Sequence, residues 1–434
     1  MNVETTISVL VLAYTIISFS MYSFARRLRD SIVAAFSMAT AVFLLYLSFQ
    51  GRGVFGLIGA VGSANLLFSL FMGEMKKVER RAMFSMLGVY FVSVSMLLAS
   101  TRDSLRIFIY WEVIAMLMIG SMALYRRDEG YEAALKYAVI CLPASIVGLF
   151  GLIIALQETG VTSFPQILLN ASDLAKYLMA VGFGAEVALF PMYVWLPSLY
   201  VGMHPLLLSV EVSSVLPATT YIVGTIASSS TPVALATSSL AITGSLIGSL
   251  SAIVQRDLRK LLSYSTLSHI GYIILGLSVG SALARDYSLL HMVAHAIPKA
   301  SLVMLSLALL SKLGDSSVEG LSRFGGSYKF VAIGGALALL GLPPFLSFWS
   351  ELFIFLGTFS STMPWKILSL LFFTAILIST GYSFKIIYSF SKDSSEAKKF
   401  GTDAYGALLL LFFLFSLLLS PIQSYIISYF LGPI

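Results

Sequence analysis

The stretch HMVAHAIPKASLVMLSLALL, residues 291–310, decides the class of fold that this sequence encodes. It is mostly apolar, and about 20 such residues are what an α-helix needs to cross the hydrocarbon core of a bilayer. His291, His295 and Lys299 nevertheless lie within it, spaced four residues apart. That spacing places the three side chains along about two turns of one helix face. The sequence therefore predicts a membrane span that carries a row of proton-binding groups.

The whole chain has the composition of an integral membrane protein. Of its 434 residues, 58% are hydrophobic and 11% are charged, and the mean hydropathy is +0.91. A water-soluble domain of this size could not hide so much apolar surface. Charged and turn-rich points divide the chain into apolar segments, so we predict an all-α membrane protein with about 14 transmembrane helices. The expected regions are 1–81 with three helices, 82–228 and 232–390 with five helices each, and 391–434 with a cytoplasmic loop and a last helix.

Basic residues predict how the chain crosses the membrane. The formal net charge is +6, and most Lys and Arg lie in alternate loops, including those at 26–29, 76–81, 256–260 and 392–399. The positive-inside rule places these loops in the cytoplasm, and an even number of helices then puts both termini outside the plasma membrane. The first segment lacks a basic n-region and a cleavage site, so we expect it to be retained as a helix. In this setting the basic excess does not point to a nucleic-acid partner.

The sequence predicts no catalytic residue and no cofactor on this chain. Cys141 is the single cysteine, whereas an iron–sulfur cluster needs about four thiolates. The glycine fingerprint that follows a strand in dinucleotide-binding domains is also missing from the sequence.

Ten titratable residues fall within the apolar segments or close to their ends. An ionised side chain at the centre of a membrane helix costs roughly 3 kcal/mol even on the lenient insertion scale, so ten cannot all face lipid. One such group could be a buried side chain paired with a neighbouring helix, but ten together favour a proton relay through side chains and water. The predicted relay residues are Glu112, Lys136, Glu186, Glu211, His269, His291, His295, Lys299, Glu351 and Lys385.

The histidines could instead be ligands of a metal ion. A zinc ion could use His291 and His295, but the residues between them supply no carboxylate and Lys299 is a poor ligand. A haem iron needs histidines on facing helices, and only His269 and His204 could act as partners. We therefore predict a relay rather than a metal centre.

Proline interrupts two further apolar segments. Pro191 lies in GFGAEVALFPMYVWLP at 182–197, and Pro343 and Pro344 lie in LALLGLPPFLSFWSE at 337–351. A proline removes a backbone donor and opens carbonyls to a cavity or an ion. Breaks at corresponding places in the two halves predict two inverted five-helix repeats, in which the seventh and twelfth helices are discontinuous. The alternative is that the prolines mark two unrelated helix kinks. The expected pairs are Glu112 with His269, Lys136 with Lys299, Glu186 with Glu351 and Glu211 with Lys385.

Several stretches resemble a known family, the antiporter-like membrane subunits shared by respiratory complex I, membrane-bound hydrogenases and Mrp-type sodium/proton antiporters. They are YWE at 110–112, EAALKYAVICLPAS at 132–145, ALFPMYVWLPSLY at 188–200, QRDLRKLLSYSTLSHIGY at 255–272, HMVAHAIPKA at 291–300 and GLPPFLSFWSE at 341–351. The resemblance implies fourteen helices with inverted repeats and a polar axis through the membrane centre. It assigns Glu112 to the fifth-helix glutamate, Lys136 to the sixth-helix lysine and Glu351 to the twelfth-helix charged position. The same resemblance assigns 291–299 to the eleventh-helix relay.

The first half departs from the family pattern at two positions. The seventh-helix lysine of the family is Glu186 here, and the eighth-helix lysine position is Pro217. Glu112, Glu186 and Glu211 then have Lys136 as their nearest candidate cation. Neighbouring buried acids cannot all ionise cheaply, so we expect at least one to be neutral at pH 7 and this half-channel to be modified or silent.

These patterns lead to one main functional hypothesis and two alternatives. The main one is a proton-translocating subunit of a redox-driven pump related to complex I or a membrane-bound hydrogenase. Its expected partners are other membrane subunits, peripheral subunits that hold the redox cofactors, lipid, and protons or sodium ions. The alternatives are a subunit of an Mrp-type cation/proton antiporter and a non-pumping structural subunit with the same fold.

Overall fold

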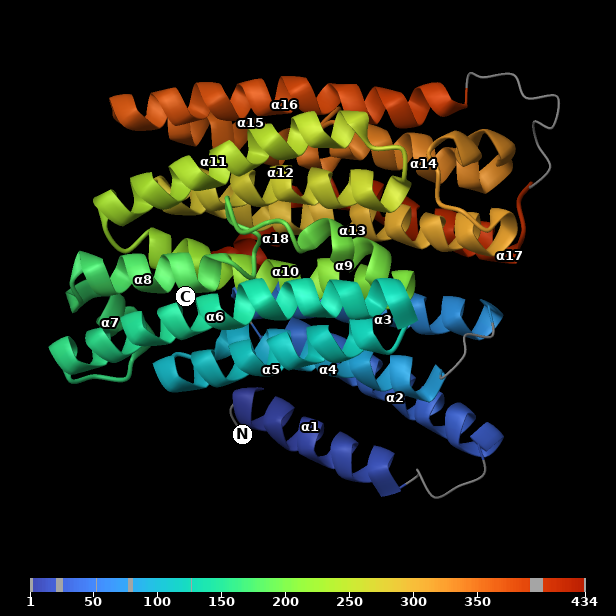
Figure 1. The fold of residues 1–434 in the computed structure, drawn as a ribbon, viewed down its shortest axis with the longest axis horizontal. Helices are drawn as coiled ribbons and strands as arrows, with labels where there is room; N and C mark the ends of the chain where they lie inside the picture. Colours follow the sequence, from blue (N-terminus) through green and yellow to red (C-terminus); the bar gives the residue numbers. More distant parts are fainter. Residues whose placement is uncertain are drawn as a thin grey trace.

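The fold is a bundle of long helices that lie alongside one another, from α1 at one edge to α16 at the other (Figure 1). The structure is a computed structural model that describes residues 3–20, 26–51, 53–76, 81–125, 127–390 and 401–432. No strand forms within these residues, and the β-bridges among them are two isolated ones. The predicted all-α class is confirmed.

The helices are grouped by the regions expected from the sequence, which stay a prediction. Before the repeats come α1 (Val3–Ser20), α2 (Arg26–Gln50) and α3 (Val54–Lys76). The first predicted repeat contains α4 (Arg81–Ser100), α5 (Ser104–Ala123), α6 (Arg127–Thr159), α7 (Phe164–Asn170), α8 (Asp173–Gly184), α9 (Leu196–Gly202) and α10 (Pro205–Ala227). The second contains α11 (Thr231–Val254), α12 (Leu258–Ser278), α13 (Ala282–Leu313), the 3-10 helix Glu319–Arg323, α14 (Gly326–Leu339), α15 (Leu346–Phe359) and α16 (Met363–Ser389). The chain ends with α17 (Ala404–Leu419), α18 (Gln423–Ile426) and a π-helical turn (Ile427–Leu431).

Ten of the described helices are long and apolar enough to cross a membrane, and an eleventh span forms if α17 and the segment Gln423–Leu431, bent by 81°, are counted together. The predicted total of fourteen requires α1 and the two broken pairs α8/α9 and α14/α15 to span as well, and it stays a prediction. The predicted cytoplasmic loop at 391–400 and the basic loop at 77–80 lie outside the described residues.

Three helices form the centre of the bundle. In their apolar windows, 94% of α10, 94% of α12 and 89% of α13 is buried, against 33% of α6 and 39% of both α5 and α16. Side chains on α12 and α13 therefore face protein, whereas much of α6 faces outward. Titratable residues on the central helices are enclosed, as the cost of placing charge in lipid requires.

The two halves share a local motif at equal separation. An aspartate caps the start of α5 and of α12, where Asp103 accepts from the Arg106 amide and Asp257 from the Arg259 and Lys260 amides. Each aspartate also forms an antiparallel bridge with a serine that follows the next helix, Asp103 with Ser163 and Asp257 with Ser317. From Asp103 to Asp257 and from Ser163 to Ser317 the separation is 154 residues.

The interior prolines follow this register with a shift of one residue. An interior proline lies in α6 at Pro143 and in α13 at Pro298, 155 residues apart. The register supports a repeat, while its inverted orientation stays a prediction. It pairs Lys136 with His291, which is also 155 residues further on, so the predicted pairing of Lys136 with Lys299 is out of register. Sequence alone missed this because it aligned charged residues rather than backbone features.

Both predicted helix breaks are confirmed. The backbone leaves the helix between α8 and α9, around Pro191, and between α14 and α15, around Pro343 and Pro344. A side chain beyond each break returns to a carbonyl just before it: Trp195 Nε1 donates to the Ala185 oxygen at 3.0 Å, and Ser347 Oγ donates to the Ala338 oxygen. Each of these carbonyls also accepts a backbone amide, from Ala188 and from Gly341, so the side chain adds a second hydrogen bond at the break.

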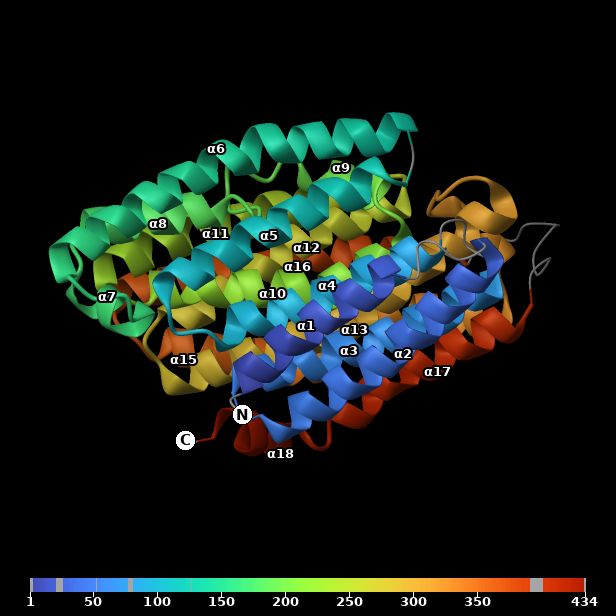
Figure 2. The same cartoon turned by 90° about the horizontal axis from the view of Figure 1, so that it is seen from below.

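The described ends of the chain lie in the same half of the bundle along its long axis (Figure 1 and Figure 2). An even number of crossings has this consequence. The side of the membrane on which the two ends lie remains a prediction.

Candidate functional site

The second half brings together titratable side chains from four helices in the centre of the bundle. They are His269 on α12, His291 and Lys299 on α13, Glu351 on α15 and Tyr382 on α16. Every one is buried, and Lys299, His291 and Tyr382 have no exposed surface. Buried polar groups need partners, so the hydrogen bonds of this cluster decide what it can do.

Lys299 occupies one end of the cluster. Its Nζ atom donates to the Leu262 carbonyl oxygen at 3.0 Å and to Ser265 Oγ at 2.7 Å. Ser265 Oγ in turn donates to the Tyr382 hydroxyl at 3.2 Å. A buried amine is thus connected through two hydroxyl groups, each of which can accept one proton and donate another.

The histidines continue from the same tyrosine. The Tyr382 hydroxyl lies 3.3 Å from His269 Nε2, His269 Nδ1 lies 3.0 Å from His291 Nε2, and His291 Nδ1 lies 2.8 Å from Ser350 Oγ. Each imidazole is engaged at both ring nitrogens, so a proton accepted on one nitrogen can leave from the other. The hydrogen bonds form one unbroken path from Lys299 to Ser350.

Glu351 and His295 flank this path. Glu351 Oε1 lies 4.0 Å from His269 Nδ1, and its carboxylate packs against Gly341, whose φ is +69°. A Cβ atom at Gly341 would lie 2.2 Å from Glu351 Oε2, so a glycine is needed there. The ring of His295 lies 4.7 Å from that of His269, centroid to centroid, and its buried Nε2 has no hydrogen-bond partner among the described residues.

The first half holds three acids in a different arrangement. Glu186 lies in the break after α8, is buried, and accepts a hydrogen bond from the Tyr137 hydroxyl. Glu112 is close enough to repel Glu186, and its Oε1 is buried without a partner among the described residues. Glu211 on α10 is buried as well and interacts electrostatically with Tyr137.

Lys136 does not serve these acids as their cation. Its side chain is 42% exposed on the outer helix α6, where it pairs with Glu132 one turn earlier and donates to Ser198 Oγ at 3.2 Å. Lys136 was expected as the nearest cation to these acids, but its partners among the described residues are Glu132 and Ser198, because α6 covers an edge of the fold.

Lys385 also lies apart from the path. Its Nζ donates to the Ile253 carbonyl oxygen at 2.8 Å and to that of Gln255, at the end of α11. A cation there satisfies free carbonyls and the negative end of the helix dipole. His204, named in the haem alternative, caps α10 by accepting from the Leu206 amide at 3.2 Å.

Sequence analysis missed a polar junction between the two halves. Tyr200 on α9 and Thr266 on α12 share a 2.5 Å hydrogen bond, and Thr266 donates to the Leu262 carbonyl oxygen at 3.0 Å. Lys299 donates to that same oxygen. The only sequence signal was the high frequency of hydroxyl residues in these spans, which does not single out any of them.

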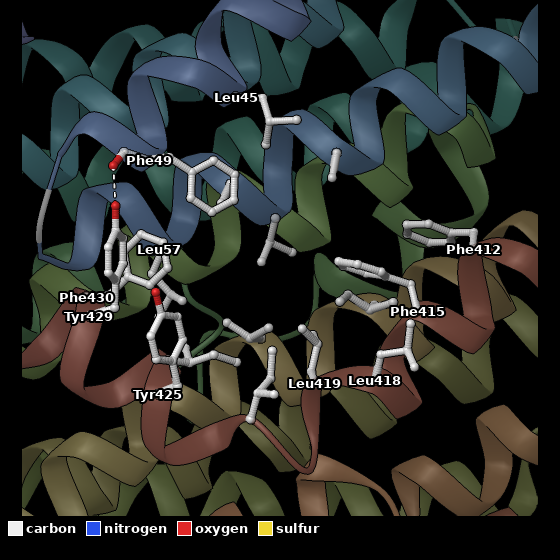
Figure 3. Close-up of a pocket in the computed structure, with 17 residues that line it drawn as sticks. Leu45, Phe49, Leu57, Phe412, Phe415, Leu418, Leu419, Tyr425, Tyr429 and Phe430 are labelled. Atoms are coloured by element: carbon white, nitrogen blue, oxygen red, sulfur yellow. Dashed lines mark hydrogen bonds between the residues drawn. The ribbon is translucent and has the colours of Figure 1, made fainter.

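An apolar pocket of about 550 Å³ lies on another side of α13 (Figure 3). Val293 and Ile297 of α13 line it together with side chains of α2, α3, α17 and the C-terminal segment. The Tyr429 hydroxyl donates to the Phe49 carbonyl oxygen at 2.6 Å at its edge. None of the lining residues is an acid, a base or a histidine, so the pocket does not extend the path.

Comparison with known proteins identifies sequence relatives. Residues 101–379 match the family described as "NADH:quinone oxidoreductase/Mrp antiporter, TM". NADH-quinone oxidoreductase subunit N of Desulforudis audaxviator is 29% identical over 321 residues, which cover 67% of this chain and 61% of that protein. NADH-quinone oxidoreductase subunit 14 of Thermus thermophilus is 30% identical over 283 residues, which cover 63% and 62%. The chain thus spans about three-fifths of the length of these relatives.

Solved structures share the fold at low sequence identity. A chain of the archaeal membrane-bound sulfane sulfur reductase, a respiratory membrane complex, superposes with a TM-score of 0.88 at 19% identity, over 99% of this chain and 97% of that one. A chain of the Mrp complex from Dietzia sp. DQ12-45-1b gives a TM-score of 0.82 at 17% identity, over 99% and 96%. At these identities the likeness shows the arrangement of helices alone.

Proposed function

Because the chain belongs to the NADH:quinone oxidoreductase/Mrp antiporter transmembrane family, we propose that it is a proton-translocating subunit of a redox-driven membrane complex. The observation that carries this proposal is the unbroken hydrogen-bonded path from Lys299 to Ser350. Every link after the lysine can both accept and donate a proton. Such a row is expensive to bury in a membrane and serves as a proton pathway in other proteins.

In the proposed mechanism, Lys299 stores a proton and releases it to Ser265 when its surroundings change. Tyr382 passes the proton to His269, and the shared hydrogen bond delivers it to His291. Glu351 next to His269 stabilises the charged imidazole while it exists. Protons would move from the cytoplasm outward, driven by a neighbouring subunit that changes the balance of charges around Lys299.

The first half plays a different part in this proposal. Glu186 is held by Tyr137 and lies near Glu112, with no lysine in the position of a partner. This half would supply protons through Glu211 and the Tyr200–Thr266 junction, or it would stay closed.

We also propose the setting of the protein. Its relatives are subunits of NADH-quinone oxidoreductases, and its structural neighbours come from multisubunit membrane complexes. These likenesses support other membrane subunits as partners. The distribution of basic loops supports a plasma-membrane location with both termini outside. Redox cofactors would be held by peripheral subunits of the complex rather than by this chain.

A cation/proton exchange function of the Mrp type is the second candidate. The family description includes Mrp antiporters, and the fold matches a chain of an Mrp complex. The proton path fits both candidates, so the partner subunits distinguish them. A non-pumping structural role is the third, and it is motivated by Glu186 at a position where the family carries lysine.

The test compares two lysine variants in inside-out membrane vesicles of the source organism. Lys299→Ala is expected to abolish respiration-driven acidification while the complex still assembles, as judged by native electrophoresis. Lys366→Ala, near the start of α16 and away from the path, is the matched control and should behave as the wild type. Unchanged acidification in Lys299→Ala would favour the structural role.

A further inference from the structure

We propose that His269, His291 and Glu351 form a binding site for a divalent transition-metal ion of the zinc class, and that this ion blocks the path when it binds. The blocking step rests on the proposed function, whereas the metal site rests on geometry alone. The sequence did not reveal the group because its members come from α12, α13 and α15, and the pair considered there was His291 with His295.

The donor atoms are already gathered. One ligand atom from each of the three residues lies within 4.8 Å of the other two. His269 Nδ1 and His291 Nε2 are 3.0 Å apart, and a tetrahedral zinc ion at its usual bond lengths separates two nitrogens by about 3.3 Å. Glu351 Oε1, 4.0 Å from His269 Nδ1, would move closer by under about 1 Å. Two imidazoles with one carboxylate are a common protein ligand set for zinc.

The hydrogen bonds at the outer ring nitrogens of the two histidines also suit a metal ion. A ligating histidine is usually held in place by a hydrogen bond at its other ring nitrogen. Here His291 Nδ1 is held by Ser350 Oγ at 2.8 Å, and His269 Nε2 by the Tyr382 hydroxyl at 3.3 Å. Both rings can therefore present their inner nitrogen as a lone pair to the same point. A bound ion would replace the proton that the two nitrogens share.

The carboxylate supplies an independent reason. Glu351 is only 6% exposed, and among the described residues its nearest charged or basic contact is His269 at 4.0 Å, too long for a hydrogen bond. A carboxylate with so little exposure, and with no hydrogen-bond donor among the described residues, is costly to keep charged unless a cation lies beside it. Lys299, the nearest buried amine on α13, is directed to Leu262 and Ser265 instead. A metal ion between Glu351 and the histidines would meet this need.

The carboxylate lies close in sequence to an exposed segment. Glu351 packs on Gly341 in the break before α15, and the following residues 342–344 are exposed. The break therefore places the site a few residues from the protein surface. An ion held at its inner end would occupy both facing nitrogens of the path and stop proton passage between His269 and His291.

The experiment titrates the purified full-length chain in detergent with Zn²⁺ by calorimetry, followed by X-ray absorption at the zinc edge. We expect one saturable ion with nitrogen and oxygen ligands at about 2.0–2.2 Å. His291→Gln and Glu351→Gln should each weaken binding more than about tenfold. His204→Asn, which removes a histidine elsewhere and keeps a side chain suited to capping α10, should bind as the wild type.

Wild-type affinity in both site variants, or only oxygen ligands in the spectrum, would overturn the site. A second measurement tests the metal site separately from the proposed function. Zn²⁺ should inhibit acidification in wild-type vesicles. In Glu351→Gln vesicles the inhibition should be weaker, when each rate is compared with the rate of the same variant without metal. Saturable binding without inhibition would overturn the blocking role, while loss of acidification in Lys299→Ala together with no binding would keep the relay and reject the metal site.

Discussion

His269 Nδ1 lies 3.0 Å from His291 Nε2, so two imidazoles on different helices share one proton in the middle of the bundle. The bond joins α12 to α13 at a point where neither side chain has contact with solvent. It is the central link of the path, and both of its neighbours, Tyr382 and Ser350, are hydroxyl groups.

Removing the Tyr382 hydroxyl is expected to interrupt the path. Tyr382→Phe keeps the ring in place but leaves Ser265 and His269 without a connection. Proton pumping in vesicles should fall at least about tenfold, a conservative figure beside what positioned proton-transfer groups contribute elsewhere. Tyr272→Phe is the matched control, since Tyr272 is equally buried beside His269 and bonds to Ser268 off the path. Equal pumping in both variants would exclude Tyr382 from the path.

The junction between the halves is expected to show energetic coupling. Thr266→Val leaves the Tyr200 hydroxyl buried without its partner, which should cost about 1–3 kcal/mol of stability. Adding Tyr200→Phe removes the orphaned group, so a double-mutant cycle should give an interaction energy of at least about 0.5 kcal/mol. Unfolding in detergent measures it, and Thr220→Val, whose hydroxyl bonds within its own helix, is the control. If the stability effects of the two single variants are additive, Tyr200 and Thr266 do not interact energetically.

Lys385 is expected to stabilise α11 rather than to carry protons. Lys385→Met removes the donor to the carbonyls of Ile253 and Gln255 and should cost about 1–3 kcal/mol of stability. Pumping per assembled complex should stay within about twofold of the wild type, because the path does not include this residue. Acidification and thermal unfolding in the same preparation test both statements. Loss of pumping at unchanged stability would show that Lys385 takes part in proton transfer.

Glu186 is expected to tolerate loss of its charge. Glu186→Gln keeps an oxygen that accepts from the Tyr137 hydroxyl and removes any repulsion with Glu112. Pumping and its pH profile should therefore change by less than about twofold, the small effect of losing a group that takes no part in the transition state. A tenfold loss would instead show that the first half takes up protons through this carboxyl.

The stability that Asp403 contributes at the start of α17 is expected to depend on pH. Burial disfavours its charge, but hydrogen bonds from Lys312, Tyr328 and the Gly406 amide outweigh this and lower its pKa to about 2. Since the folded-state pKa is below the ordinary value of about 3.9, the stabilisation is present above that value and is lost as the pH falls toward 2. The melting temperature should drop over this range in the wild type and drop less in Asp403→Asn. Asp173→Asn, an exposed acid in α8, should follow the wild type.

The two helix breaks and much of the second half could be predicted from the sequence, because prolines and charges stand out in apolar spans. Pro191, Pro343 and Pro344 mark the two breaks, and His269 and His291 do meet. Ser265, Ser350 and Tyr382 could not be predicted, since hydroxyl residues occur throughout these helices and only packing selects the few that connect titratable groups.

The positions of Lys136 and Lys385 were also beyond the sequence. A membrane helix is apolar on the side that faces lipid and on the side that faces protein, so its pattern does not tell which face a lysine occupies. The half-exposed ion pair of Lys136 with Glu132 and the cap formed by Lys385 both depend on neighbours that lie far away or on the outer surface.

The equal separation of the two aspartate-capped bridges bears on how the fold arose. A constant register that carries different side chains is the pattern left by gene duplication followed by divergence. Helices α3 and α17 exist once and pack against α13, while α6, its counterpart in the first half, stays largely uncovered. Helices α10, α12, α14 and α15 of the two predicted repeats also pack against α13, so helices from both halves and from the chain ends enclose it, whereas α6 forms an outer wall.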